Sequence, residues 1–139
     1  LVLSPVQPRP RGSDGRDSLK AAPLVYVHSK VSIFDGARAV VSSANLNGRS
    51  LRWDTEAGLE LRTPSHVAAL RRRVMGHWLP PGAAPADLDP ATAFDRWKDL
   101  ADRNSRRPPR DRRGFLVHYD PELARETGMP VPGVPDEMV

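Results

Sequence analysis

One short run of the chain has the pattern His28-x-Lys30-x4-Asp35, and Ser43-x-Asn45 follows it. A phosphodiester resists attack because its negative charge repels nucleophiles and its alkoxide leaving group is poor. An imidazole can attack the phosphorus or pass a proton to the leaving oxygen. A lysine ammonium and an asparagine amide can bind the non-bridging oxygens, whose charge grows in the transition state. The run therefore holds the parts needed to break a phosphodiester without a metal or another cofactor.

The spacing of these residues predicts which side chains could act together. In an extended strand His28 and Lys30 point to the same face, about 7 Å apart along the backbone, so both could reach one phosphate. Ser43 and Asn45 would share a face by the same rule if the backbone stays extended there. An ionised Glu56 could accept the Nδ1 proton of a histidine and so fix the tautomer of its ring.

The residues around the run predict paired strands. Val31 and Ile33 alternate with Lys30 and other side chains of the opposite face, and the β-branched segment 38–42 reads as the returning strand. Asp35-Gly36 between them is a strong turn signal. We therefore interpret residues 24–42 as a strand pair. Asp35, at the turn, would reach back to neutralise or orient nearby groups.

Two amphipathic helices are predicted downstream. Thr63-Pro64 provides an N-cap and a proline at the first helical position, and apolar residues follow at helical spacing as far as Trp78. A similar pattern predicts a helix over residues 90–104. A short helical or irregular crossing and a strand are expected between the strand pair and the first helix, over residues 45–52 and 56–62.

Composition limits the rest. The 139 residues suit one modest domain, and the 15 prolines lie largely outside residues 24–79. We expect a loop or linker over 1–23 from a missing upstream half, a catalytic half over 24–80, and a helix plus irregular tail over 81–139. The segment 106–113 looks too charged and proline-rich to pack. The absence of cysteine excludes disulfides and thiolate catalysis, and the net charge of +4 tolerates anionic partners.

The order and spacing of the run resemble the HKD signature of the phospholipase D superfamily. The likeness extends through Asn-Leu-Asn-Gly-Arg-Ser at 45–50 and Asp-Thr-Glu at 54–56, and it covers about residues 24–79. The segments 26–30 and 43–50 look like the second motif of lipid-acting members. The resemblance implies an α/β fold, half of an α/β/α sandwich with a mixed sheet, followed by an irregular Pro/Arg-rich tail.

The resemblance also implies roles for the site residues. His28 is one of two paired histidines, as general acid/base or as nucleophile. Lys30 and Asn45 bind the substrate phosphate, Ser43 supports the same pocket, and Glu56 falls where a carboxylate orients a histidine. Asp35 belongs to the motif, with a role that can be mainly structural. One departure is Ser42, where the family commonly has glycine, and a need for positive φ there would make the change costly.

The chain contains one such motif, while members of this superfamily bring two together at one active site. The implied enzyme is a bacterial phospholipase D-like or cardiolipin-synthase-like phosphodiesterase or phosphatidyltransferase. Its partners would be a phospholipid, water or an alcohol, and a second half from an upstream segment or a second copy. Peripheral contact with a bacterial membrane stays open, as does a soluble location. The alternatives are a homodimeric endonuclease acting on nucleic acid and a truncated, non-catalytic fragment.

Overall fold

The computed structural model describes residues 1–10 and 18–122. Their contacts form two compact units, one built from the described residues up to Tyr26 and those from Arg71 onward, the other from Val27–Leu70. Both units combine short antiparallel strand pairs with helical segments, so the predicted α/β class is confirmed. No helix in the described residues has the length and apolar content needed to cross a bilayer.

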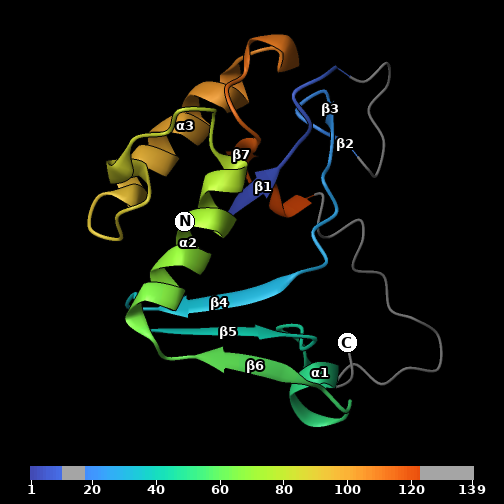
Figure 1. Cartoon of the computed structure of the whole chain (residues 1–139). Coiled ribbons are helices and arrows are strands. Elements are labelled where there is room, and N and C mark those ends of the chain that lie inside the picture. The colour runs from blue at the N-terminus through green and yellow to red at the C-terminus, as the bar shows by residue number, and fades with distance from the viewer. Residues whose placement is uncertain (11–17, 123–139) are drawn as a thin grey trace, which may run out of the picture. The chain divides into compact units, whose positions relative to one another are not determined.

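A three-stranded antiparallel sheet forms the centre of the unit Val27–Leu70 (Figure 1). Its strands lie in the order β4-β5-β6, and β4 and β5 are joined by the predicted turn at Asp35-Gly36. The hairpin confirms the expected strand pair. The bounds of the three strands are Lys30–Phe34, Arg38–Ser42 and Gly58–Leu61.

The first strand of the hairpin begins later than expected. We predicted a strand from residue 24, but Val25 to Ser29 have no regular strand structure and β4 starts at Lys30. The reason is the length of β5, which ends at Ser42, directly opposite Lys30. The chain bends at Ser43, whose N–H donates to the carbonyl oxygen of Ala57 over 2.9 Å. The β4–β5 ladder therefore stops before it reaches His28.

The two faces of the sheet differ as the alternation predicts. Residues directly opposite in an antiparallel pair share a face, so Val31 and Val41 lie on the apolar face with Leu59. Lys30, Ser42 and Gly58 form a row across the other face. Large apolar side chains remain exposed in this unit, Leu46 by 96% and Leu59 by 74%.

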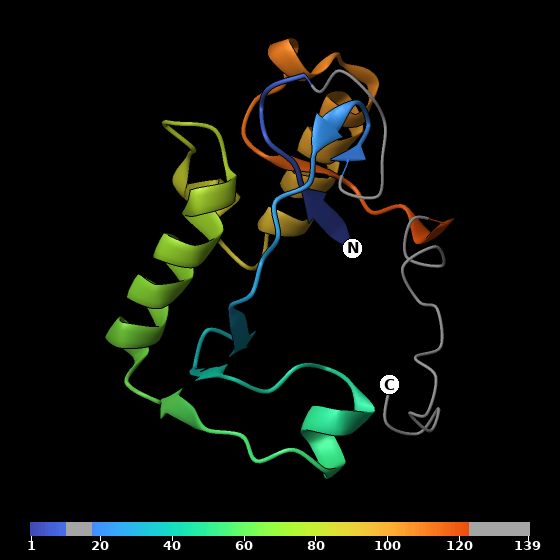
Figure 2. The ribbon, with the colours of Figure 1, turned by 90° about the vertical axis from the view of Figure 1, so that its right-hand side faces the viewer.

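Helix α1 and the first part of helix α2 complete this unit. Helix α1 (Gly48–Arg52) is the predicted crossing between β5 and β6 (Figure 2). Asn47 caps it, because its side-chain oxygen accepts the N–H of Ser50 over 3.0 Å. Helix α2 (Pro64–Trp78) begins at the predicted proline and continues from this unit into the other one.

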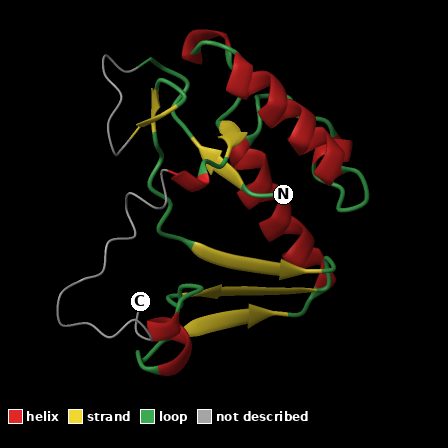
Figure 3. Ribbon diagram, turned by 180° about the vertical axis from the view of Figure 1, so that it is seen from behind, coloured by secondary structure: helices red, strands yellow, loops and turns green. Residues whose placement is uncertain are grey.

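The second unit contains strands where we expected a loop. A loop was predicted over 1–23, but β1 (Leu3–Pro5) pairs with β7 (Leu116–His118) and β2 (Ser18–Leu19) pairs with β3 (Ala22–Pro23) (Figure 3). These strands are too short for a period to be seen in the sequence, and the partner of β1 lies at the other end of the described chain. The buried core includes Val6, Leu19, Ala22 and Val117.

Helix α3 (Ala93–Arg106) contributes to a second buried cluster of this unit, in which Leu100 packs with Leu79 and Leu116. It starts three residues later than the predicted 90, because Asp89 first forms a local turn: its carboxylate accepts the N–H of Ala91 over 2.9 Å. Two single-turn helices, η1 and η2, flank it at Pro85–Asp87 and Pro109–Asp111.

The charged segment after α3 packs, contrary to our expectation. Pro109 is buried, and the Nε of Arg112 donates to the carbonyl oxygens of Asn104 and Arg107 over 2.9 and 3.0 Å. The last carbonyls of a helix lack partners within it, so a guanidinium is well suited to satisfy them. Sequence reasoning treated the arginines of 106–113 only as charges and overlooked this capping role.

Candidate active site

Lys30 and Asn45 line the same open pocket in the unit Val27–Leu70. Its volume is about 390 Å³. Lys30 is the first residue of β4 and is opposite Ser42, the last residue of β5; Asn45 lies three residues beyond Ser42, past the bend at Ser43. The rest of the lining is hydroxyl-bearing or apolar, from Ser29, Val31, Ser32, Ser42, Ala44, Leu46 and Leu51. A cation and an amide donor thus share one hollow, as a phosphate-binding pair requires.

Ser43 and Glu56 contact one another. The Ser43 hydroxyl donates to a carboxylate oxygen of Glu56, and the same hydroxyl oxygen accepts the N–H of Ala57 over 3.1 Å. Hydrogen bonds from the hydroxyls of Ser43 and then Ser50 lower the pKa of Glu56, with a smaller contribution from the charge of Lys30 and a partial opposing effect of desolvation. Glu56 is therefore an ionised carboxylate whose charge interacts with Lys30.

The lowered pKa of Glu56 predicts a pH-dependent contribution to stability. Because its folded-state pKa lies below the unfolded value, this contribution is fully present above the unfolded pKa and is lost as the pH falls through the folded pKa. Glu56→Gln should reduce the loss of unfolding free energy on acidification in this range, measured by urea unfolding at a series of pH values. Ser43→Ala should act in the same direction, and pH profiles identical to wild type would contradict the assignment.

His28 and Asp35 are not among the residues that line the pocket of Lys30 and Asn45. His28 is exposed, two residues before Lys30, in the irregular stretch that leads into β4. Because that stretch is not a strand, the alternation rule does not fix the side to which its ring points. Asp35 sits at the hairpin turn with φ of 50°, five residues and about 17 Å along the strand from Lys30. The structure does not bring Asp35 to the pocket, and its place is that of a turn residue.

Sequence reasoning missed two supporting features. Ser50 ends the motif segment 45–50 but was not predicted as a site residue. Its hydroxyl donates to Glu56, and its own N–H donates to the side chain of Asn47. Asn47 was the available signal, because asparagine is among the residues preferred at a helix N-cap. The second feature is Gly58, which is opposite Ser42 in the sheet.

Gly58 explains how serine is accommodated at position 42. Ser42 is not among the residues with positive φ, so the backbone there places no demand for glycine. A Cβ built on Gly58 would lie 2.8 Å from the Cβ of Ser42 and 3.2 Å from the carbonyl oxygen of Val41. The missing side chain at 58 therefore makes room for the serine, next to Lys30 in the same row.

Gly58→Ala is expected to lower the free energy of unfolding by about 1–3 kcal/mol, because the added methyl group overpacks the contact with Ser42. The measurement is urea unfolding followed by circular dichroism. Gly76→Ala is the matched control: it lies in α2 with nothing within 4 Å of the added Cβ, so it should stabilise by about 0.5–1 kcal/mol. Ser42→Gly in the Gly58→Ala background should recover part of the loss, and the absence of recovery would count against this pairing.

The described residues contain no group of three or more His, Cys, Asp or Glu side chains that could hold a metal ion. What this unit does offer is a cation and an amide in one hollow, an ionised carboxylate interacting with the cation, and an exposed imidazole two residues from the lysine. These are groups that bind an anion and move a proton.

Residues 13–78 match a family model described as cardiolipin synthase, PLD-like domain. The match supports the resemblance of this part of the chain to the phospholipase D superfamily. The PLD-like domain includes all of Val27–Leu70 and therefore every predicted site residue. It supports the phosphodiesterase or phosphatidyltransferase kind of activity of that superfamily. In sequence, the chain matches no curated protein.

Proposed function

We propose that this chain supplies one HKD half of an enzyme that cleaves or transfers phospholipid phosphodiesters through a phosphohistidine. The observation that carries the proposal is the shared pocket of Lys30 and Asn45 within a PLD-like domain. Lys30 neutralises one non-bridging phosphate oxygen, and the Asn45 amide donates to another as charge develops. The catalytic half is proposed to run over 24–80, with 1–23 and 81–139 as its flanks.

The reaction proceeds by two displacements at phosphorus. In the first, a ring nitrogen of one histidine forms a P–N bond while the bond to the leaving oxygen breaks, and the second histidine protonates that oxygen. In the second, the latter histidine takes a proton from water or an alcohol, whose oxygen attacks phosphorus as the P–N bond breaks. We assign the acid/base role to His28 and the covalent role to the histidine of the second motif. Ionised Glu56 orients a histidine and stabilises its charged form.

A second half is part of the proposal because the chain has one motif. Apolar side chains next to the site residues support it: Val27 is 43% exposed beside His28, and Leu46 is 96% exposed beside Asn45. A covering surface from a second half would remove these side chains from water. The covering surface would come from an upstream segment or from a second copy of this chain.

The proposal predicts phosphatidyl exchange that persists in a chelator. The full-length protein is incubated with phosphatidylglycerol or phosphatidylcholine and a primary alcohol in EDTA, and the product is analysed for the phosphatidyl alcohol. Exchange is expected because a covalent intermediate can be intercepted by an alcohol, and because Lys30 and Asn45 supply the required donors. Complete loss of activity in EDTA would contradict the phosphohistidine mechanism.

The same assay, repeated with DNA as substrate, distinguishes the proposed lipid activity from the endonuclease and non-catalytic alternatives. If no lipid exchange occurs while DNA is cleaved by a dimer, identified by light scattering, the chain is a single-motif endonuclease of the same superfamily. If neither substrate reacts in the full-length protein, the non-catalytic alternative holds.

A further inference from the structure

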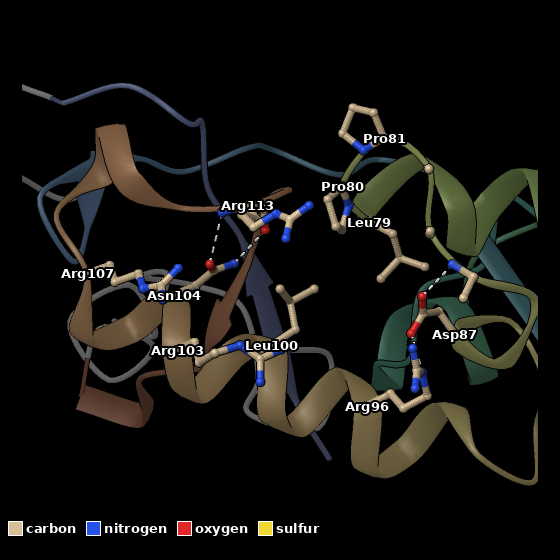
Figure 4. A pocket seen from close by; sticks show the side chains of 13 residues that line it. Leu79, Pro80, Pro81, Asp87, Arg96, Leu100, Arg103, Asn104, Arg107 and Arg113 are labelled. Atoms are coloured by element: carbon tan, nitrogen blue, oxygen red, sulfur yellow. Dashed lines mark hydrogen bonds and ion pairs between the residues drawn. The ribbon is translucent and has the colours of Figure 1, made fainter.

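A second basic pocket lies in the other unit, formed by the turn after α2 and the C-terminal half of α3 (Figure 4). Its volume is about 430 Å³. Arg103 lies in the last turn of α3, Arg107 is the C-cap residue that follows the helix, and Arg113 comes from the segment that returns along it. Buried Leu79 and Leu100 contribute the apolar part of the lining. None of these residues belongs to the candidate active site.

The backbone that carries Arg113 is held firmly. Asn104 is 1% exposed, and its Nδ2 donates to the carbonyl oxygens of Arg113 and Leu116, both over 2.9 Å. Its Oδ1 accepts the N–H of Arg113 over 3.1 Å. The next residue is Gly114, with φ of 69° and no room for a Cβ, which would lie 2.8 Å from the carbonyl oxygen of Trp78. The position of Arg113 relative to α3 is therefore set before any ligand binds.

The charges around this pocket are not balanced within it. Arg96 is paired with Asp87, whose carboxylate also accepts the N–H of Ala84 over 2.7 Å. Within residues 1–10 and 18–122, no carboxylate forms an ion pair with Arg103, Arg107 or Arg113. Three guanidinium groups thus line one hollow whose single carboxylate is already neutralised. A bound anion would provide the counter-charge that these arginines lack among the described carboxylates.

We propose that this pocket binds a phosphate group, carried by a lipid headgroup or by a small soluble phosphate compound. Guanidinium forks match phosphate oxygens bidentately. A phosphomonoester suits three unpaired arginines better than a single carboxylate does, because it brings up to two negative charges and three terminal oxygens. The proposal adds an anion site to the chain and does not depend on the catalytic proposal.

The test is direct binding to the full chain, with titration calorimetry for inorganic phosphate and glycerol 3-phosphate, and flotation for two kinds of vesicle. One vesicle is pure phosphatidylcholine, and the other also contains phosphatidic acid. Arg103→Gln/Arg107→Gln should weaken binding by about a hundredfold, since each charge-assisted hydrogen bond is worth about tenfold or more. Both side chains are exposed and form no ion pair within the described residues, so the variant should keep its circular dichroism spectrum.

The matched control is Arg72→Gln/Arg73→Gln, which removes the same charge from exposed positions of α2 outside the pocket. Binding of the soluble compounds that only the pocket variant loses would support a soluble source. Loss limited to phosphatidic acid vesicles would support a lipid source. The proposal is overturned if none of these probes binds, or if both double variants weaken binding equally, since that would reflect net charge alone. Binding of an oligonucleotide but of no phosphate compound would also overturn it.

Discussion

Replacing His28 with alanine is expected to reduce phospholipid cleavage by the full-length protein by about 10²–10⁴-fold in kcat, the range for loss of a general acid/base. His28 is exposed and precedes the sheet, so its removal should leave the fold and the unfolding free energy unchanged. The measurement is steady-state release of headgroup, combined with circular dichroism. His66→Ala is the matched control, because that histidine is also exposed and lies in the same unit, on α2.

The leaving group separates the two roles that His28 could have. A general acid matters less when the leaving oxygen needs no proton. With a nitrophenyl phosphodiester as substrate, His28→Ala should therefore form the covalent intermediate at a rate much closer to that of wild type. A nucleophile cannot be bypassed in this way, and the variant would then be inactive on both substrates. Activity of His28→Ala within about tenfold of wild type on phospholipid would contradict either role.

The hairpin was predictable from sequence because its signals are local. Val31 and Ile33 alternate with polar positions, and Asp35-Gly36 favours a turn, so the register of Lys30 against Ser42 followed. The start of β4 was not predictable, because it depends on where the partner strand ends. The strands β1 and β2 were missed for a related reason: each is two or three residues long, and the partner of β1 lies in β7. Strands this short show no alternation of apolar and polar residues, and a partner so far along the chain gives no local signal.

In the site too, local features were predictable from the sequence, and features that depend on distant residues were not. Residue types and spacing selected Lys30 and Asn45, and the fold lines one pocket with both. The room that Gly58 leaves for Ser42 was not visible in the sequence, since the two residues are neighbours only across the sheet. The arginine pocket was hidden as well, because Arg103, Arg107 and Arg113 look like an ordinary charged surface until α3 and the returning segment place them together.

Replacing Lys30 with alanine is the second change with a large expected effect. Loss of one preorganised donor to the charged transition state should lower kcat by about 10²–10³-fold. Lys30→Arg keeps the charge but changes the shape of the donor, so it should recover only part of the activity. Lys98→Ala is the matched control, since Lys98 lies on α3 in the other unit and forms a surface pair with Asp102 over 3.2 Å.

The pKa of Glu56 provides a second measurement on the Lys30 variant. The charge of Lys30 contributes to the lowered pKa of Glu56, so Lys30→Ala should raise that pKa towards its ordinary value, as measured by NMR titration of the carboxyl group. The rise should be partial, because the hydroxyl of Ser43 has the larger effect and remains. A kinetic loss together with this shift would place the lost charge beside Glu56 in the working enzyme. Full activity with an unchanged pKa of Glu56 would mean that the ammonium group neither binds the substrate nor interacts with Glu56.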